Sequence, residues 1–178
     1  AQVIKQGIND VNLTRLNKLE QQQFTAVLAD IFEHSAWVAQ QVWAKRPFVD
    51  VDELHRVMVA QVSAAGLDPQ LALLRAHPEL AGKEAQGGGL TSASESEQAG
   101  ANLDSLNSAE MVSIERLNRA YRENFGFPFI IAVRNHTTDG IFAEFERRVE
   151  NDIVTERSTA LEQVAFIARF RLDDLLLQ

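Results

Sequence analysis

The sequence predicts an all-α protein, built as a single compact multi-helix domain. Apolar residues recur at spacings of three and four along nearly the whole chain of 178 residues, which is the period of an amphipathic helix. Alternating runs rich in β-branched residues, which would indicate strands, are scarce. We expect residues 12–178 to form the domain and residues 1–11 to be a disordered or processing-derived N-terminal segment.

Four helices are expected in the first half of the chain, at residues 20–32, 37–44, 51–65 and 68–77. Gly66 suits the C-terminal end of the third helix, because glycine readily adopts the left-handed conformation that ends many helices. Asp68 and Pro69 suit the N-cap and the first position of the fourth helix. Pro78 should end that helix, because proline has no amide hydrogen to donate.

The second half begins with a Gly- and Ser-rich stretch, residues 82–93, which we expect to be a flexible connector. A helix should follow Ser94, and another should begin after Asn107, which forms a capping pattern with Glu110. Gly126 should end the latter helix. Two further helices are expected at residues 139–149 and 158–177.

Residues 127–133 form an apolar block of seven residues with Pro128 inside it. The block is too short to be an independent helix. Periodicity does not distinguish a buried extended segment from the start of a buried helix, so both interpretations stay open at this point.

The composition excludes several classes of protein. The chain has 25 acidic residues against 17 Lys and Arg, a formal charge of -8, so it offers no basic field to a nucleic acid. It contains no Cys, which excludes disulfides, thiolate metal sites and a cysteine nucleophile. It shows no apolar run of about 20 residues, which a membrane-spanning helix needs, and no signal peptide or C-terminal Ser-Lys-Leu signal. We therefore expect a cytoplasmic protein that binds neither nucleic acid nor membrane.

The four histidines, His34, His55, His77 and His136, lack the spacing at which two of them would face one metal ion on a helix, so no metal site is predicted. We expect His34 and His136 to cap helices or face solvent, and His55 to lie on a helix surface. His77 ends a helix just before Pro78. A histidine there is a favourable cation at the negative end of the helix dipole, and it is also suited to proton transfer near neutral pH.

Ser94 and Glu97 fit the capping box, in which the glutamate side chain accepts a hydrogen bond from the backbone N–H of the serine. The same geometry would bring N–H groups and a carboxylate together at a helix start. Such a corner suits an anion or a urea-type group, so a structural and a binding role of Glu97 are compatible.

The last expected helix carries two apolar stripes, and we expect each stripe to pack against a partner, either the core or another subunit. The first stripe contains Leu161, Val164, Ala165, Ala168, Leu172, Leu175 and Leu176, and the second contains Phe166, Ile167, Phe170 and Leu177. Arg171 falls between the stripes, away from Glu162 and Asp173, so no acidic residue of its own helix can neutralise it. We expect Arg171 to lie in a pocket, where a substrate carboxylate would be its anion.

Several motifs resemble the OHCU decarboxylase family, where OHCU is 2-oxo-4-hydroxy-4-carboxy-5-ureidoimidazoline. They are HPELAG at 77–82, LT followed by SxxEQAGA within 90–101, NxxYxxxFGFPFIIAV at 118–133, and RL at 171–172. The segments FEHS at 32–35, WV at 37–38 and RPF at 46–48 also look like that family. The similarity covers nearly the whole chain from about residue 12. Two residues depart from the family pattern: Glu79, where Asp is common, and Asn102, where Gly is expected.

This resemblance implies an all-helical homodimer that needs no cofactor and converts OHCU to (S)-allantoin with loss of carbon dioxide. It implies that His77 is the catalytic acid or base, that Glu97 is its partner, and that Arg171 contacts the charged group of the substrate. The implied substrate-lining residues are Pro78, Ser94, Glu95, Ser96, Glu97, Gln98, Phe129, Ile130, Ile131, Ala132 and Val133.

From the residues alone, two other classes stay open. A helical ligand-binding or adaptor module without catalysis would also show a two-striped last helix and a glycine-rich loop. A metal-assisted amidohydrolase would need histidines and carboxylates that converge from distant parts of the chain.

Overall fold

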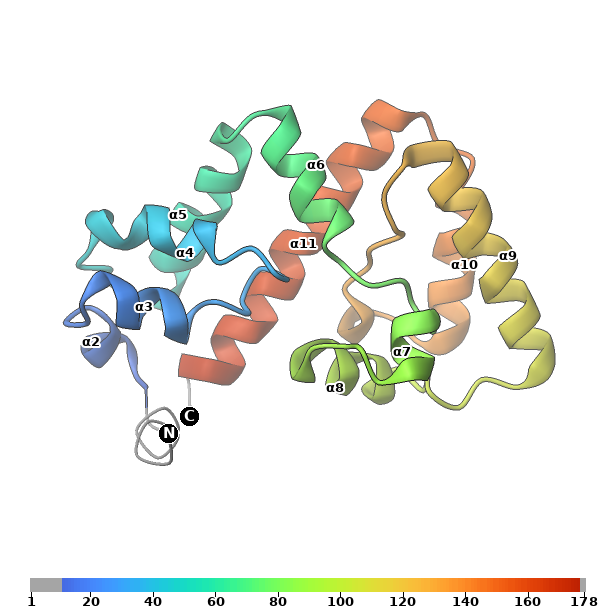
Figure 1. Cartoon of the computed structure of the whole chain (residues 1–178), viewed down its shortest axis with the longest axis horizontal. Helices are drawn as coiled ribbons and strands as arrows, with labels where there is room; N and C mark the ends of the chain where they lie inside the picture. The colour runs from blue at the N-terminus through green and yellow to red at the C-terminus, as the bar shows by residue number, and fades with distance from the viewer. Residues whose placement is uncertain (1–10, 177–178) are drawn as a thin grey trace. The chain divides into compact units, whose positions relative to one another are not determined.

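A computed structural model describes residues 11–176 of the chain (Figure 1). Over that range the chain consists of α-helices and 3-10 helices joined by turns and contains no strand, so the all-α prediction is confirmed. Packing divides the chain into two compact units: a first unit made of the chain up to Leu73 together with the segment from Ala165, and a second unit, Leu74–Val164. The single-domain organisation stays a prediction. So does the expectation of a disordered or processing-derived N-terminal segment, because residues 1–10 lie outside the described residues.

The first unit begins with five short elements: α2 (Leu13–Leu16), α3 (Gln21–Val27), α4 (Trp37–Val42), the 3-10 helix η1 (Trp43–Lys45) and α5 (Val51–Ala64). Helix α4 packs against both α3 and α5. Helix α3 is shorter than predicted, because the chain leaves the helical conformation at Leu28 and continues in turns. These turns still bury Leu28, Ile31 and Phe32, which accounts for the apolar spacing that suggested a longer helix.

Helix α5 ends as predicted: Ala65 is its C-cap, and Gly66 follows with a φ of 87°. Helix α6 (Leu67–Arg75) begins one residue before Asp68. No single helix within residues 11–176 is long and apolar enough to cross a membrane, and α5 and α6 reach that length and composition only as a pair bent by 115°.

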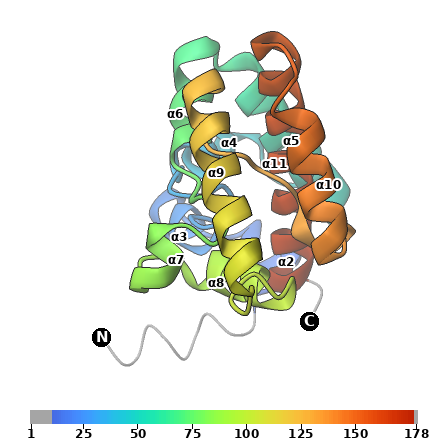
Figure 2. The ribbon, with the colours of Figure 1, turned by 90° about the vertical axis from the view of Figure 1, so that its right-hand side faces the viewer.

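The second unit contains α7 (Lys83–Gly87), α8 (Ser92–Gly100), α9 (Ser108–Phe125), η2 (Val133–Asn135), α10 (Thr138–Arg148) and the first half of α11 (Ile153–Leu176). Helix α9 packs against α10, and the two lie side by side in Figure 2, while α8 packs against η2. Helix α7 occupies part of the stretch expected to be a flexible connector, so that prediction is wrong for Lys83–Gly87.

Both predicted ends of α9, the cap at Asn107 and the stop at Gly126, are confirmed. Asn107 accepts a hydrogen bond from the backbone N–H of Glu110 (2.9 Å), and the Glu110 side chain accepts one from the N–H of Asn107 (3.0 Å). Gly126 ends the helix with a φ of 75°, in the left-handed region. The face between these ends buries Ile114, Leu117, Asn118, Tyr121 and Phe125.

Helix α11 begins five residues before the predicted position, because Asp152 caps it. The Asp152 carboxylate accepts hydrogen bonds from the N–H (2.9 Å) and the hydroxyl (2.7 Å) of Thr155. Along the first predicted stripe, Val164, Ala168, Leu172 and Leu176 are buried. On the second stripe, Phe166 is 43% exposed, and Leu177 lies outside the described residues.

Candidate active site

His77 lies two residues beyond the end of α6, immediately before Pro78. The predicted helix end at His77 is therefore wrong, because α6 already ends at Arg75 and a turn follows it. The backbone N–H of His77 donates to the carbonyl of Leu74 (3.3 Å), which closes a turn after the helix. The residue is only 7% exposed. A histidine that only stabilises the helix dipole as a cation can face solvent and need not be buried. The burial of His77 therefore favours the other predicted role, proton transfer by an imidazole in the interior of the second unit.

The turn that follows His77 is fixed by side chains from α8 and α9. The Gln98 side chain accepts a hydrogen bond from the N–H of Ala81 (2.9 Å) and donates one to the carbonyl of Glu79 (3.3 Å). Asn118 of α9 donates to the carbonyl of Leu80 (3.0 Å). Both ends of the Gln98 amide are thus engaged, and Gln98 supports the segment that carries His77.

Helix α8 is capped by Thr91, not by Ser94, so the predicted capping box is wrong. The Thr91 hydroxyl accepts the hydrogen bond from the N–H of Ser94 (3.2 Å), which places Ser94 in the third helical position. Glu97 therefore lies in the second turn of the helix, beyond the free N–H groups of the first turn. Glu97 is therefore not the capping-box partner of Ser94.

A cavity of about 200 Å³ lies beside this second turn. It is lined by Ser96, Glu97, Gly100, Ala101, Val133, Arg134 and His136. Three predicted substrate-lining residues from two segments, Ser96, Glu97 and Val133, therefore share one cavity. Arg134 and His136 also line the cavity. Neither residue was predicted as part of the site, although both lie within three residues of the end of the apolar block.

The apolar block is a buried extended segment, followed by η2. Residues Phe129, Ile130, Ile131, Ala132 and Val133 are all at most 7% exposed. Two polar side chains hold their backbone: Arg148 donates to the carbonyl of Ile130 (2.8 Å), and Gln163 accepts from the N–H of Ala132 (3.0 Å). This resolves the alternative left by the sequence in favour of the extended form.

A polar cluster lies beneath this segment. Arg148 and Glu156 form an ion pair (3.0 Å) in which the side chains are 1% and 0% exposed. Tyr121 donates a hydrogen bond to Glu156. Burial, together with that hydrogen bond, raises the pKa of Tyr121 far above its usual value. No local pattern in the sequence predicts this cluster, because its members come from three different helices.

Arg171 belongs to the first unit, where it is 7% exposed. It donates hydrogen bonds to the Glu33 carboxylate (2.7 Å) and to the carbonyl of Asp30 (2.8 Å). Both of these acceptors come from outside α11. We expected a substrate carboxylate to be the anion of Arg171, but the structure places the Glu33 carboxylate there, 138 residues away in the sequence.

The remaining histidines have ordinary surroundings. The His34 side chain is 62% exposed, and the His55 ring nitrogen Nε2 lies 2.8 Å from the carbonyl oxygen of Ala165. Within residues 11–176 no three His, Asp or Glu side chains are grouped as metal ligands would be.

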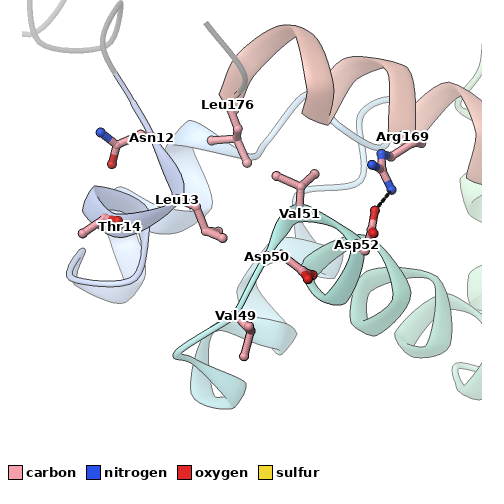
Figure 3. Close-up of a pocket in the computed structure, with 9 residues that line it drawn as sticks. All are labelled: Asn12, Leu13, Thr14, Val49, Asp50, Val51, Asp52, Arg169 and Leu176. Carbon is pink, nitrogen blue, oxygen red and sulfur yellow. Dashed lines mark hydrogen bonds and ion pairs between the residues drawn. The ribbon is translucent and has the colours of Figure 1, made fainter.

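A larger cavity, of about 460 Å³, lies in the first unit (Figure 3). It is lined by Asn12, Leu13, Thr14, Val49, Asp50, Val51, Asp52, Arg169 and Leu176. Figure 3 shows Arg169 and Asp52 joined as an ion pair on one side of it. None of the predicted catalytic or substrate-lining residues lies on this cavity, so we place the candidate site at the smaller one.

The chain is similar to known proteins over nearly its whole length. The OHCU decarboxylase family model matches residues 17–173. The 2-oxo-4-hydroxy-4-carboxy-5-ureidoimidazoline decarboxylase of Haloferax volcanii is 44% identical over 165 residues, which cover 93% of this chain and 96% of that protein. The protein of the same name from Mus musculus is 36% identical over 166 residues, 93% of each chain.

Two solved structures are also similar. A crystal structure of (S)-allantoin synthase has a TM-score of 0.76 and 32% identity over 93% of this chain, which spans only 54% of that protein. A crystal structure of OHCU decarboxylase in the presence of (S)-allantoin has a TM-score of 0.66 and 17% identity, and it shares the fold. With a match to the family model over almost its entire described length, the chain belongs to the OHCU decarboxylase family.

Proposed function

We propose that the chain is a carboxy-lyase that converts OHCU to (S)-allantoin in urate degradation. The family assignment carries this proposal. It is supported by the buried position of His77 on a turn held by Gln98, and by the cavity that Glu97 borders.

The proposed reaction breaks the bond between a ring carbon and the carboxylate of OHCU. Carbon dioxide leaves, the bonding pair forms a C=C bond to the neighbouring ring carbon, and the π pair of that carbon's C=N bond moves onto the nitrogen, which takes up a proton. The enol formed in this way loses its hydroxyl proton and becomes a carbonyl, and a proton delivered to one face of the ureido-bearing carbon sets the configuration of the product. Because the ring accepts the electrons, we propose that no cofactor is needed. The protein has to orient the carboxylate and to move one proton.

Within this scheme His77 carries the proton, since imidazole exchanges protons near neutral pH. Glu97 either orients His77 or accepts N–H bonds from the ureido arm. The segment Phe129–Val133 lines the substrate, and Arg171 contacts its charged group. These roles follow from the family resemblance, and the separate environments of the side chains allow each to be tested alone.

The proposed activity is tested by mixing the protein with freshly made OHCU and following circular dichroism as chiral product forms. We expect strong acceleration, with and without a metal chelator. An unchanged spontaneous rate would indicate a binding or adaptor module and would overturn the proposal. Loss of activity in chelator would indicate a metal enzyme and would overturn its cofactor-free form.

We also propose a homodimer. The second stripe of α11 supports it, because Phe166 is 43% exposed and an exposed aromatic residue on an apolar stripe is typical of a contact surface. Sedimentation should show a dimer that Phe166→Glu converts to a folded monomer, whereas Val49→Glu, at an exposed apolar residue outside the stripe, should leave the dimer intact. A stable monomer of the unaltered chain would contradict this. The cytoplasmic location stays a prediction.

A further inference from the structure

The second unit buries an ion pair that the proposed reaction does not use. Arg148 of α10 and Glu156 of α11 are 1% and 0% exposed, and they meet through three N–H to carboxylate contacts of 3.0 to 3.2 Å. Removing two charges from water is costly, and apolar residues of similar volume often give equal or greater stability. Stability alone therefore does not explain why the pair is there.

Arg148 also contacts the apolar segment in two ways. Its Nη1 donates to the carbonyl of Ile130 (2.8 Å), and its guanidinium carbon lies 4.4 Å from the centre of the Phe129 ring. Phe145 packs on the other face of that ring: the two rings are stacked, with centroids 3.9 Å apart and an interplanar angle of 8°. One side chain thus fixes both the backbone and a ring of the segment.

Glu156 in turn fixes Arg148. Besides the arginine, its carboxylate accepts hydrogen bonds from Tyr121 and from the side chain of Asn151 (3.0 Å). A carboxylate with three partners has one well-defined position, and the planar fork of Arg148 must align with it. The position of the Ile130 carbonyl is therefore set by a chain of contacts that begins at Tyr121.

We propose that Arg148 and Glu156 are positioning residues of the decarboxylase: they hold the segment Phe129–Val133 in the shape that binds the substrate. This inference rests on the proposed function, in which that segment lines the substrate. Neither side chain touches the substrate, and both act through Phe129 and Ile130.

The decisive experiment replaces the cluster by apolar residues. The triple variant Tyr121→Phe, Arg148→Met and Glu156→Leu removes both charges and the hydroxyl together, so no buried charge is left alone. The matched control is Glu144→Leu with Arg147→Met, which removes an exposed ion pair of α10 (2.6 Å). We expect the KM for OHCU to rise at least tenfold in the triple variant, with a smaller change in kcat, and to stay within twofold in the control.

A second measurement does not depend on activity. The N–H of Ala132 donates to Gln163, so its hydrogen exchange reports the order of the segment, while the N–H of Leu117, in the middle of α9, reports global unfolding. In the triple variant we expect exchange at Ala132 to accelerate at least tenfold relative to Leu117. If the triple variant does not fold, Arg148→Lys, which keeps the charge and loses the fork, should show the same two changes in weaker form.

The outcomes separate the two proposals. If the unaltered chain does not accelerate the reaction, the proposed function fails, and exchange at Ala132 alone decides whether the cluster orders the segment. The inference is overturned if the unaltered chain is active and the triple variant, or Arg148→Lys in its place, folds with an unchanged KM and an unchanged hydrogen-exchange rate at Ala132. The cluster would then be only structural.

Discussion

His77, Glu97 and Arg171 stand in three different environments, and each environment limits what the side chain can do. His77 is almost buried on a braced turn, so its imidazole has few alternative positions. Glu97 borders a cavity and can meet a ligand directly. Arg171 already has a buried carboxylate beside it, so a substrate anion would have to share it with Glu33.

Replacing His77 tests the proton carrier. We expect His77→Asn to lose nearly all enzymatic acceleration while the chain stays folded, since a helix-end histidine contributes at most about 2 kcal/mol to stability. The decay of OHCU and the helical circular dichroism signal are measured on the same sample. His34→Asn is the control, because that side chain is 62% exposed. Normal turnover per folded molecule in His77→Asn would disprove its catalytic role.

Glu97→Gln tests whether a carboxylate is required at the cavity. Because Thr91 caps α8, the change should barely alter the free energy of unfolding, yet we expect activity to fall about a hundredfold, as loss of a positioned acid–base partner does. Glu115→Gln, at an exposed glutamate of α9 outside the proposed site, should keep full activity. Steady-state kinetics and urea unfolding measure both effects, and near-normal turnover in Glu97→Gln would leave it no catalytic role.

Arg171→Lys distinguishes two roles of Arg171: pairing with Glu33 in the folded chain, and binding of the substrate. Lysine keeps the charge but lacks the planar guanidinium, whose Nη1 donates to both Glu33 and Asp30, so we expect a loss of about 1–3 kcal/mol in the free energy of unfolding. If Arg171 also binds substrate, the KM should rise about tenfold in the folded protein. Arg169→Lys, in a half-exposed ion pair, should change neither quantity appreciably. An unchanged KM in Arg171→Lys would assign Arg171 to Glu33 alone.

At the scale of the element, the register of α8 decides which side chains reach the cavity. With Thr91 as N-cap, Ser94 and Gln98 fall on the buried face, one turn apart, and Glu97 falls beside the cavity. A cap at Ser94 would have placed Glu97 in the first turn. Because the N-cap lies three residues earlier than predicted, Glu97 is a candidate site residue and not a capping partner.

Thr91→Ala tests this register. Loss of the hydroxyl leaves the N–H of Ser94 without its cap, so we expect the chain to lose about 1 kcal/mol of stability. Ser92→Ala removes a hydroxyl one residue later, where the side chain is exposed and takes no part in the cap, and should be nearly neutral. Urea unfolding of the two variants provides the comparison. Equal stability of both variants would mean that Thr91 does not cap the helix.

Elements whose signals are local could be predicted from the sequence. Both ends of α9 were predicted correctly, because Asn107, Glu110 and Gly126 act within a few residues of themselves. The start of α11 was missed because its first turn does not follow the apolar pattern: Ile153 and Val154 are 49% and 62% exposed. The left-handed conformation of Asn102 (φ 59°) also explains its departure from the expected glycine, since asparagine tolerates that region.

Features that depend on distant residues could not be predicted. The extended form of residues 127–133 depends on Arg148 and Gln163, which come from later helices. The partner of Arg171 is likewise far away in the sequence. Periodicity describes one helix at a time, so it identified the apolar segment and the position of Arg171 between two apolar stripes, but not the distant groups that bind them.

At the scale of the whole molecule, alkaline stability should depend on the only tyrosine in the chain. Burial raises the pKa of Tyr121 in the folded state, whereas in the unfolded chain it ionises near pH 10. Above about pH 10 the unfolded state therefore releases a proton that the folded state keeps, and stability should fall by about 1.4 kcal/mol per pH unit.

Urea unfolding between pH 9 and 11 measures this slope, and Tyr121→Phe should reduce it. Tyrosinate absorbance should appear only as the chain unfolds, since no second tyrosine contributes. Tyrosinate absorbance from the folded protein near pH 10 would contradict the burial of this hydroxyl.

The division of the chain has a consequence for its synthesis. The second unit is continuous, but the first unit needs the segment from Ala165 onward, which is synthesised after the whole second unit. At about 5–20 residues per second, the N-terminal helices wait several seconds for the turns of α11 that complete their core. During that interval Glu33 has no Arg171 beside it, and the apolar face of α3 to α5 is open. A nascent chain halted before Ala165 should therefore recruit chaperones through its N-terminal third, even after its middle has folded.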